Sequence, residues 1–297
     1  MPRLRRPTAG KGHTAPLPDV SQVLRRARAG YHAGVTPAHL ARALFHGGPA
    51  ALQGRVIFGM PKHIRALALG PHAGGYRTNP LQLERPGGVV LEGWCATPVD
   101  GPAHTTLLYF GGRNEHVVWA PDMASFLPGH AVYAFNYRGT GASTGWPSEQ
   151  HARQDALAAH ALATRREPQA AGLAIMGRSL GTALAVGLAA ELAVPARLVL
   201  ASPFENVPQA VRHRRMGWAL APLVGQRFDC TVPATACTGD TLVLLAEHDR
   251  HIPHAQSLAL CARFPRPPRI ETVPATTHQS LPRSAGAQAA IARFLLG

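Results

Sequence analysis

The sequence predicts an α/β domain built on a mostly parallel β-sheet with helices on both faces. From Leu81 onward, short and nearly continuous apolar runs alternate with helical stretches. Strands that are buried on both faces carry such runs, whereas strands with one solvent-facing side alternate in polarity. We expect about eight strands. The strand-like runs are Val89–Cys95, Thr105–Phe110, Ala131–Asn136, Leu173–Met176, Arg197–Ala201, Thr241–Ala246 and Arg269–Val273.

The first two of these runs have no helix between them, so we expect them to pair antiparallel at an edge of the sheet. The later runs are separated by helical stretches, as parallel strands joined by crossovers require. The composition agrees with a globular chain: 46% of the 297 residues are hydrophobic and 15% are charged. These values exclude a coiled coil, a collagen and a charge-rich disordered chain.

A change in sequence texture predicts two parts, residues 1–76 as a basic N-terminal extension and residues 77–297 as the α/β domain. The formal charge is +14, and residues 1–70 hold eleven Lys or Arg against one acid, Asp19, which leaves +4 for the remainder. A basic surplus raises the question of a nucleic-acid partner, but the extension lacks the interleaved aromatic residues that stack on bases. The sequence therefore disfavours a nucleic-acid partner. Within the extension, Val56–Met60 and Ile64–Leu69 are apolar enough to pack on the domain.

The four cysteines, Cys95, Cys230, Cys237 and Cys261, form no C-x-x-C pair, and a chain of this length needs no disulfide framework. Reduced thiols favour a reducing compartment, and we predict a cytoplasmic protein without a transmembrane segment. The start of the sequence lacks the apolar stretch of a secretory signal. An organellar transit peptide is the alternative. Such peptides are rich in serine, whereas the first thirty residues contain only one serine, Ser21.

The most informative segment is Gly177-Arg-Ser179-Leu-Gly181, which follows a strand-like run and leads into the helical stretch Thr182–Ala193. In a G-x-S-x-G turn between a strand and a helix, the two glycines permit close approach of the backbone segments. The serine hydroxyl is then presented as a nucleophile at the start of the helix. We therefore predict Ser179 as a catalytic nucleophile; the alternative is a glycine-rich turn of an ordinary α/β domain.

A serine nucleophile needs a base, and the base needs an acid to fix its tautomer. In a fold with this strand-turn-helix nucleophile, we expect them in the order Ser, Asp or Glu, His on loops after later strands. Asp249 follows the run Thr241–Ala246, and His278 follows the last run. We predict these two residues as acid and base. Glu205, just after the run Arg197–Ala201, is the main rival acid, and Glu247 is a further one.

Three histidines near Asp249, namely His248, His251 and His254, suggest a metal site at first sight. No H-E-x-x-H or paired-cysteine spacing accompanies them. We interpret them as solvated surface and predict no metal and no cofactor.

Backbone N–H groups must stabilise the negative charge of a tetrahedral intermediate. Leu180, directly after the nucleophile, is the first candidate donor. The turn after the strand-like run Thr105–Phe110 supplies Gly112 and Arg113 as candidates for the second. The alternative is an ordinary glycine turn.

Together these motifs resemble the α/β-hydrolases over about Leu81 to Gly297. The similarity is to a compact branch with little cap structure, which includes eukaryotic protein depalmitoylases and many bacterial serine hydrolases. The matching segments are residues 109–115 (YFGGRNE), 137–143 (YRGTGAS), 147–149 (PSE), 177–181 (GRSLG), 202–204 (SPF), 246–253 (AEHDRHIP) and His278. The resemblance implies catalytic roles for Ser179, Asp249 and His278.

The sequence departs from this family pattern at two positions. Phe110 and Gly111 stand where many relatives have His-Gly, and Asn136 stands where an acid often precedes Tyr-Arg-Gly. The segment between Pro203 and Thr241 has room for a small lid, in which Ala210–Leu220 is amphipathic. Its Met and Trp residues fit either core packing or an acyl pocket.

We therefore expect a serine hydrolase that cleaves an ester or thioester of a small-molecule or acylated substrate through an acyl-enzyme. A serine peptidase with the same catalytic groups is the second candidate, because neither fold nor triad distinguishes the two substrates. A hydrolase-fold binding protein and an anion binder acting through residues 1–70 are the remaining alternatives. The sequence makes no prediction of the oligomeric state.

Overall fold

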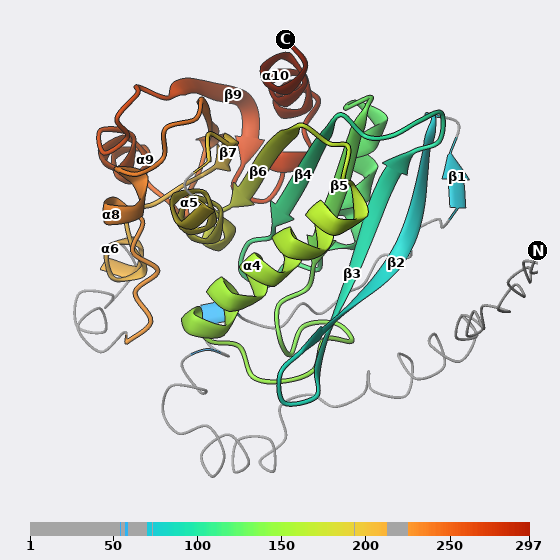
Figure 1. The fold of residues 1–297 in the computed structure, drawn as a ribbon. Helices are drawn as coiled ribbons and strands as arrows, with labels where there is room; N and C mark the ends of the chain where they lie inside the picture. The colour runs from blue at the N-terminus through green and yellow to red at the C-terminus, as the bar shows by residue number, and fades with distance from the viewer. Residues whose placement is uncertain (1–53, 55–56, 59–69, 73, 193, 213–224) are drawn as a thin grey trace, which may run out of the picture. The chain divides into compact units, whose positions relative to one another are not determined.

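The computed structural model describes residues 54, 57–58, 70–72, 74–192, 194–212 and 225–297. All of them belong to one compact unit, Pro37–Gly297. They form a nine-stranded sheet with the order β1-β2-β3-β5-β4-β6-β7-β8-β9 (Figure 1). The predicted α/β fold with a mostly parallel sheet is confirmed.

The strands fall into an antiparallel group at one side and a parallel group that runs from β5 to the other edge. Their bounds are β1 Gly70–His72, β2 Tyr76–Arg85, β3 Val89–Pro98, β4 Thr105–Phe110, β5 His130–Phe135, β6 Gly172–Arg178, β7 Arg197–Ala201, β8 Thr241–His248 and β9 Arg269–Thr277. The carboxyl ends of β4, β6, β7, β8 and β9 therefore meet at one edge of the sheet.

The expectation that β3 and β4 pair with each other is wrong. β3 pairs antiparallel with β2 and β5, while β4 pairs parallel with β5 and β6. β4 is buried along nearly its whole length. Because both of its edges are already occupied by parallel strands, no edge remains for β3.

Helices cover both faces of the sheet, as predicted. On one face, α4 and α5 pack through alanine and leucine side chains such as Ala159 and Leu184. On the other, the 3₁₀ helix η1 and α10 pack through residues such as Met123 and Ile291. The bounds are η1 Val117–Ser125, α4 Glu149–Arg166, α5 Leu180–Leu192, α6 Val207–Arg212, α8 Thr231–Ala234, α9 His254–Cys261, η3 Leu281–Arg283 and α10 Ala285–Leu296.

Local sequence explains where the long helices begin. The hydroxyl of Ser148 accepts a hydrogen bond from the His151 N–H and caps α4, and the hydroxyl of Ser284 does the same for the Ala287 N–H in α10. The buried face of α4 carries alanines at helical spacing. Their small side chains let this helix lie close to the sheet and to α5.

Part of the expected extension packs on the α/β domain. Phe58 is 2% exposed, and its ring lies edge-on to Tyr137 and Phe228 at centroid distances of 4.9 and 5.5 Å. The carbonyl of Phe58 accepts a hydrogen bond of 2.8 Å from the Asn114 N–H. β1 also precedes residue 77 and pairs with β2. The boundary at residue 76 stays a prediction, as does the role of the extension, most of which lies outside the described ranges.

Two further predictions concern parts of the chain around the sheet. Within the expected lid, the structure describes α6, but the segment 213–224, with its Met and Trp residues, lies outside the described residues. Among the described helices, none has both the length and the apolar character needed to cross a bilayer.

Candidate active site

Ser179 occupies the tight turn between β6 and α5, where its φ of 48° places it in the left-handed region. A Cβ atom at Gly177 would collide with the Gly181 carbonyl, and one at Gly181 would collide with the carbonyls of Phe110 and Gly111. Only glycine fits either position without displacing backbone atoms. The Ser179 N–H donates to the Ala201 carbonyl at 2.8 Å, which ties the turn to β7.

Leu180 is the first residue of α5. The N–H groups in the first turn of a helix have no acceptor within that helix. The Leu180 N–H therefore has no acceptor within α5, as the predicted role of oxyanion donor requires.

The structure brings Asp249 and His278 into direct contact. His278 Nδ1 and Asp249 Oδ2 are 2.8 Å apart, and the histidine is 7% exposed. Asp249 lies directly after β8 and His278 directly after β9, so both side chains come from the carboxyl ends of neighbouring strands.

Three more donors hold the Asp249 carboxylate. Its Oδ1 accepts the N–H groups of His251 and Ile252 at 2.8 and 2.9 Å, and its Oδ2 also accepts the Ser202 hydroxyl at 2.7 Å. Burial alone would raise the pKa of Asp249, but the hydrogen bond and charge of His278, with the Ile252 and Ser202 bonds, hold that pKa well below its usual range. The group is therefore a carboxylate at neutral pH.

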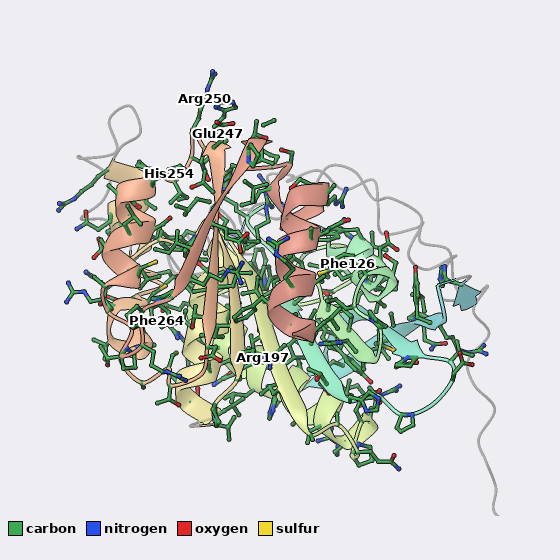
Figure 2. All side chains as sticks on the ribbon, turned by 90° about the horizontal axis from the view of Figure 1, so that it is seen from above. Phe126, Arg197, Glu247, Arg250, His254 and Phe264 are labelled. Carbon is green, nitrogen blue, oxygen red and sulfur yellow. The ribbon has the colours of Figure 1, made fainter. Side chains whose placement is uncertain are left out.

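The rival acids occupy other positions. The Glu247 carboxylate accepts the Ala275 N–H at 2.8 Å and lies 3.5 Å from His248. The backbone carbonyl of Glu205 accepts the Cys230 N–H. Figure 2 shows Glu247, Arg250 and His254 at the end of the sheet where β8 finishes, with Arg197 toward the other end. Of the three candidate acids, Asp249 carries the contact to His278.

Two residues of the site were missed by the sequence interpretation. Ser202 directly follows β7, has a φ of 50° and donates to Asp249. Its position after a parallel strand, in the Ser-Pro-Phe segment already noted, was a usable signal. His251, interpreted as solvated surface, stacks on the His278 ring with centroids 4.9 Å apart and planes at 29°. Nothing in the sequence spacing of these two histidines indicates that contact.

The predicted oxyanion loop lies directly on the nucleophile turn. A Cβ atom at Gly112 would be 3.0 Å from an Arg178 guanidinium nitrogen and 3.4 Å from the Arg178 carbonyl oxygen. The Gly112 N–H donates to Glu115 at 2.6 Å, so it faces that carboxylate. The neighbouring Arg113 is exposed. The structure thus brings the loop close to the turn that contains Leu180, but the Gly112 N–H points toward Glu115.

Both departures from the family pattern have a structural counterpart. Phe110 is 7% exposed and belongs to the hydrophobic core, while the carbonyl of Gly111 accepts the Tyr137 hydroxyl at 2.6 Å. The loop is therefore fixed by apolar packing and this hydrogen bond.

The other departure, Asn136, donates to Glu92 Oε2 at 2.9 Å and accepts the Val117 N–H at 3.0 Å. Glu92 of β3 also accepts the Ala142 N–H. An acid at position 136 would face the Glu92 carboxylate and be repelled by it. The amide at this position is thus complementary to a carboxylate that β3 supplies.

One group of ligand atoms in the described residues is close enough together to hold a metal ion. Atoms of Asp249, His251 and His278 all lie within 4.8 Å of one another. A cation bound there would compete with the hydrogen bond between Asp249 and His278. The other two histidines have different contacts: His254 Nε2 lies 2.8 Å from the Ala246 carbonyl, and His248 lies beside Glu247.

The cysteine thiols are poorly suited to act as the nucleophile. All four cysteines are free and buried. Burial raises the pKa of Cys95, Cys237 and Cys261 to about 11 and that of Cys230 further. A thiol attacks as its thiolate, which such values make rare at neutral pH.

Comparison with known proteins shows the family of the chain. A profile described as "Serine aminopeptidase, S33" matches residues 101–230. An uncharacterized protein of Mycobacterium tuberculosis is 31% identical over 199 residues, which cover 66% of this chain and 70% of that protein. The chain belongs to the α/β-hydrolase superfamily.

The lysophosphatidylserine lipase ABHD12 of Gallus gallus is 35% identical over 121 residues, which are 38% of this chain and 31% of that protein. Among solved structures, an esterase of Pyrococcus furiosus has a TM-score of 0.62 at 16% identity and covers 80% of this chain and 98% of its own. Acetyl xylan esterase 1 of Thermoanaerobacterium sp. has a TM-score of 0.59 at 17% identity, with coverages of 92% and 98%. These structural similarities support the hydrolase fold.

Proposed function

We propose that this α/β-hydrolase is a serine hydrolase that cleaves a carboxylic ester or thioester through an acyl-enzyme. The observation that carries the proposal is the Asp249–His278 hydrogen bond at the sheet edge where Ser179 directly precedes α5. The names of its relatives, a lysophosphatidylserine lipase and esterases, support an ester as the substrate.

In this mechanism, the Ser179 hydroxyl attacks the acyl carbonyl while His278 Nε2 accepts its proton. Asp249 accepts the Nδ1–H, fixes that tautomer and stabilises the imidazolium. His278 then protonates the leaving group, and a water molecule deprotonated by the same imidazole hydrolyses the acyl-enzyme. The Leu180 N–H and the Gly112–Arg113 turn stabilise the oxyanion. A Gly112 contribution requires its N–H to turn from Glu115 or to be shared with the oxyanion.

A serine peptidase is the second candidate, favoured by the description of the matching family profile. The two substrates differ in the leaving group, an alcohol or thiol against an amine. Esters of p-nitrophenol with graded acyl length, assayed beside aminoacyl p-nitroanilides, separate the candidates. A faster turnover of the anilides would assign the peptidase activity.

The nucleophile is tested with a fluorophosphonate probe, which forms a covalent bond with an activated serine. We expect labelling of the wild-type protein and its loss in Ser179→Ala, with turnover lower by about 10⁶-fold. Ser125→Ala is a matched control, because its exposed hydroxyl bonds the Asp122 carbonyl on η1. Labelling that persists in Ser179→Ala, or is absent from folded wild-type protein, would contradict the proposal. The second result would favour a binding protein.

The cytoplasmic localisation stays a prediction.

A further inference from the structure

A buried carboxylate beside the nucleophile turn has no role in the mechanism above. Glu115 lies in the loop after β4, and its side chain is 10% exposed. Its Oε1 accepts the Tyr109 hydroxyl at 2.7 Å and the Trp119 indole N–H at 2.9 Å. Its Oε2 accepts the Gly112 N–H at 2.6 Å and an Arg178 guanidinium N–H at 2.7 Å. A carboxylate offers about four lone-pair positions, so this acceptor is fully used.

Arg178 connects Glu115 to the other catalytic segments. One terminal nitrogen of its guanidinium donates to Glu115, and the other donates to the His278 backbone carbonyl at 2.9 Å. The same residue directly precedes Ser179 in the chain. One side chain thus joins the oxyanion loop, the nucleophile turn and the loop of the general base.

The pair is ionic in the folded protein. Burial alone would raise the pKa of Glu115, but the charge of Arg178 and the hydrogen bonds from Gly112 and Tyr109 hold it below its usual value. A buried charged pair adds little net stability over apolar packing of the same volume, whereas removal of one partner leaves an unpaired charge. Stability alone is therefore a weak reason for a charged pair at this point.

We propose that Glu115 and Arg178 are positioning residues that hold the oxyanion loop and the His278 loop in register with Ser179. The proposal rests on the proposed function of this site. Because Glu115 binds the Gly112 N–H, the pair sets the direction in which the next peptide groups of the loop face. Because Arg178 binds the His278 carbonyl, the same pair sets the distance of the imidazole from the nucleophile turn. A misplacement of about 1 Å in such a site costs on the order of 10²-fold in rate.

The chain offers a matched control in a second buried pair. Arg138 binds Asp155 through two hydrogen bonds of 2.8 Å, and the two side chains are 8% and 10% exposed. This pair joins the loop after β5 to α4. Asp155 also accepts a hydrogen bond of 2.9 Å from Arg85 of β2. Asp155→Asn therefore removes the charge of a similarly buried carboxylate without changing a contact to a catalytic loop.

The test compares Glu115→Gln, Arg178→Gln, the double variant and Asp155→Asn, with p-nitrophenyl acetate as substrate and a fluorophosphonate probe. We expect Glu115→Gln to lower kcat and the labelling rate by about 10²-fold, with KM within about threefold of wild type. The losses should be non-additive, so that the double variant resembles the worse single variant. Asp155→Asn should lower the thermal midpoint to a similar degree and keep kcat within about threefold. A folded Glu115→Gln variant with kcat within threefold of wild type, or additive losses, would overturn the proposal.

Arg178→Lys covers the case in which the glutamine variants do not fold. A single ammonium group retains a positive charge for Glu115 but lacks the fork that reaches both acceptors. We expect about tenfold lower kcat at a thermal midpoint near that of wild type, and an unchanged kcat would overturn the proposal.

Amide hydrogen exchange separates this proposal from the proposed function, because it needs no turnover. In a Ser179→Ala background, Arg178→Lys should accelerate exchange in residues 111–116 and around residue 278, and Asp155→Asn should not. If wild-type protein shows neither turnover nor labelling but exchange responds in this way, the function fails while the positioning contact stands. Unchanged exchange in both segments would refute the positioning contact itself.

Discussion

The substitution Asp249→Asn tests Asp249 as the acid of the proposed triad against the rival acids. The Asp249 carboxylate has two donors on each oxygen: the His251 and Ile252 N–H groups on Oδ1, and the Ser202 hydroxyl with His278 Nδ1 on Oδ2. An asparagine has one oxygen and one NH₂ group. If the NH₂ replaced Oδ1, it would face two backbone donors that cannot turn away. The oxygen therefore stays at the Oδ1 position, and the NH₂ faces Ser202 and His278.

The Ser202 hydroxyl can rotate to accept a hydrogen bond from this NH₂ group. His278 must then accept the other hydrogen bond at Nδ1 and carry its own proton on Nε2. That tautomer cannot accept the Ser179 proton. We expect kcat to fall by about 10⁴-fold, as in other serine triads that lose the correct tautomer. A factor of this size corresponds to about 5 kcal/mol in activation free energy. The assay is kcat on p-nitrophenyl acetate, with thermal unfolding as the check on structure.

Glu205→Gln is the matched control, because it makes the same change in charge at the rival strand end. We expect its kcat to remain within about tenfold of wild type. A reversed ranking would move the acid to the end of β7. A folded Asp249→Asn variant with kcat within tenfold of wild type would refute the tautomer argument.

Three further predictions follow from described contacts. Phe58→Ala should lower the free energy of unfolding in urea by about 3–5 kcal/mol, because the ring is buried between Tyr137 and Phe228. An unchanged urea midpoint would show that this part of the extension does not stabilise the domain. Ser202→Ala should lower kcat by about tenfold, because Asp249 loses a hydrogen-bond donor. Ser202→Gly relieves the positive φ and should show the same loss of kcat with less destabilisation. Equal activity of both variants and wild type would assign Ser202 no positioning role. The depressed pKa of Asp249 contributes stability that is fully present above its unfolded pKa of about 4 and is lost as pH falls through the folded value. Urea midpoints between pH 6 and pH 2 should therefore fall less steeply for Asp249→Asn than for wild type, and parallel curves would contradict this linkage.

The sequence was informative where one local pattern implies one local geometry. The glycines around Ser179 predict a strand-turn-helix unit because a side chain at either position would collide with backbone. The order of strands then predicts that Asp249 and His278 lie near each other, because parallel strands end at one edge of the sheet. The structure places the two side chains in contact.

The sequence was less informative where partners are distant or segments are short. Chain order does not determine sheet order, so the insertion of β5 between β3 and β4 was not predictable from the apolar runs. β1 and β2 were not among the predicted strands. In β2 the alternation of buried and exposed residues is interrupted at Pro80, and the three residues of β1 are too few to show a period. The pair Glu115–Arg178 joins residues 63 positions apart and has no periodic pattern at all.

Hydrogen bonds from polar side chains reach three separate loops of the candidate site. Asp249 is held by Ser202 from the end of β7, His278 by Arg178 from the end of β6, and Gly112 by Glu115 from its own loop. Each loop that carries a proposed catalytic group is thus bonded to a polar group outside the triad. A hydrogen bond to a charged group is worth more than one between neutral groups, and its geometry is more specific. We therefore expect substitutions at Ser202, Glu115 or Arg178, which bind the loops of the proposed triad and oxyanion donors, to lower turnover more than substrate binding.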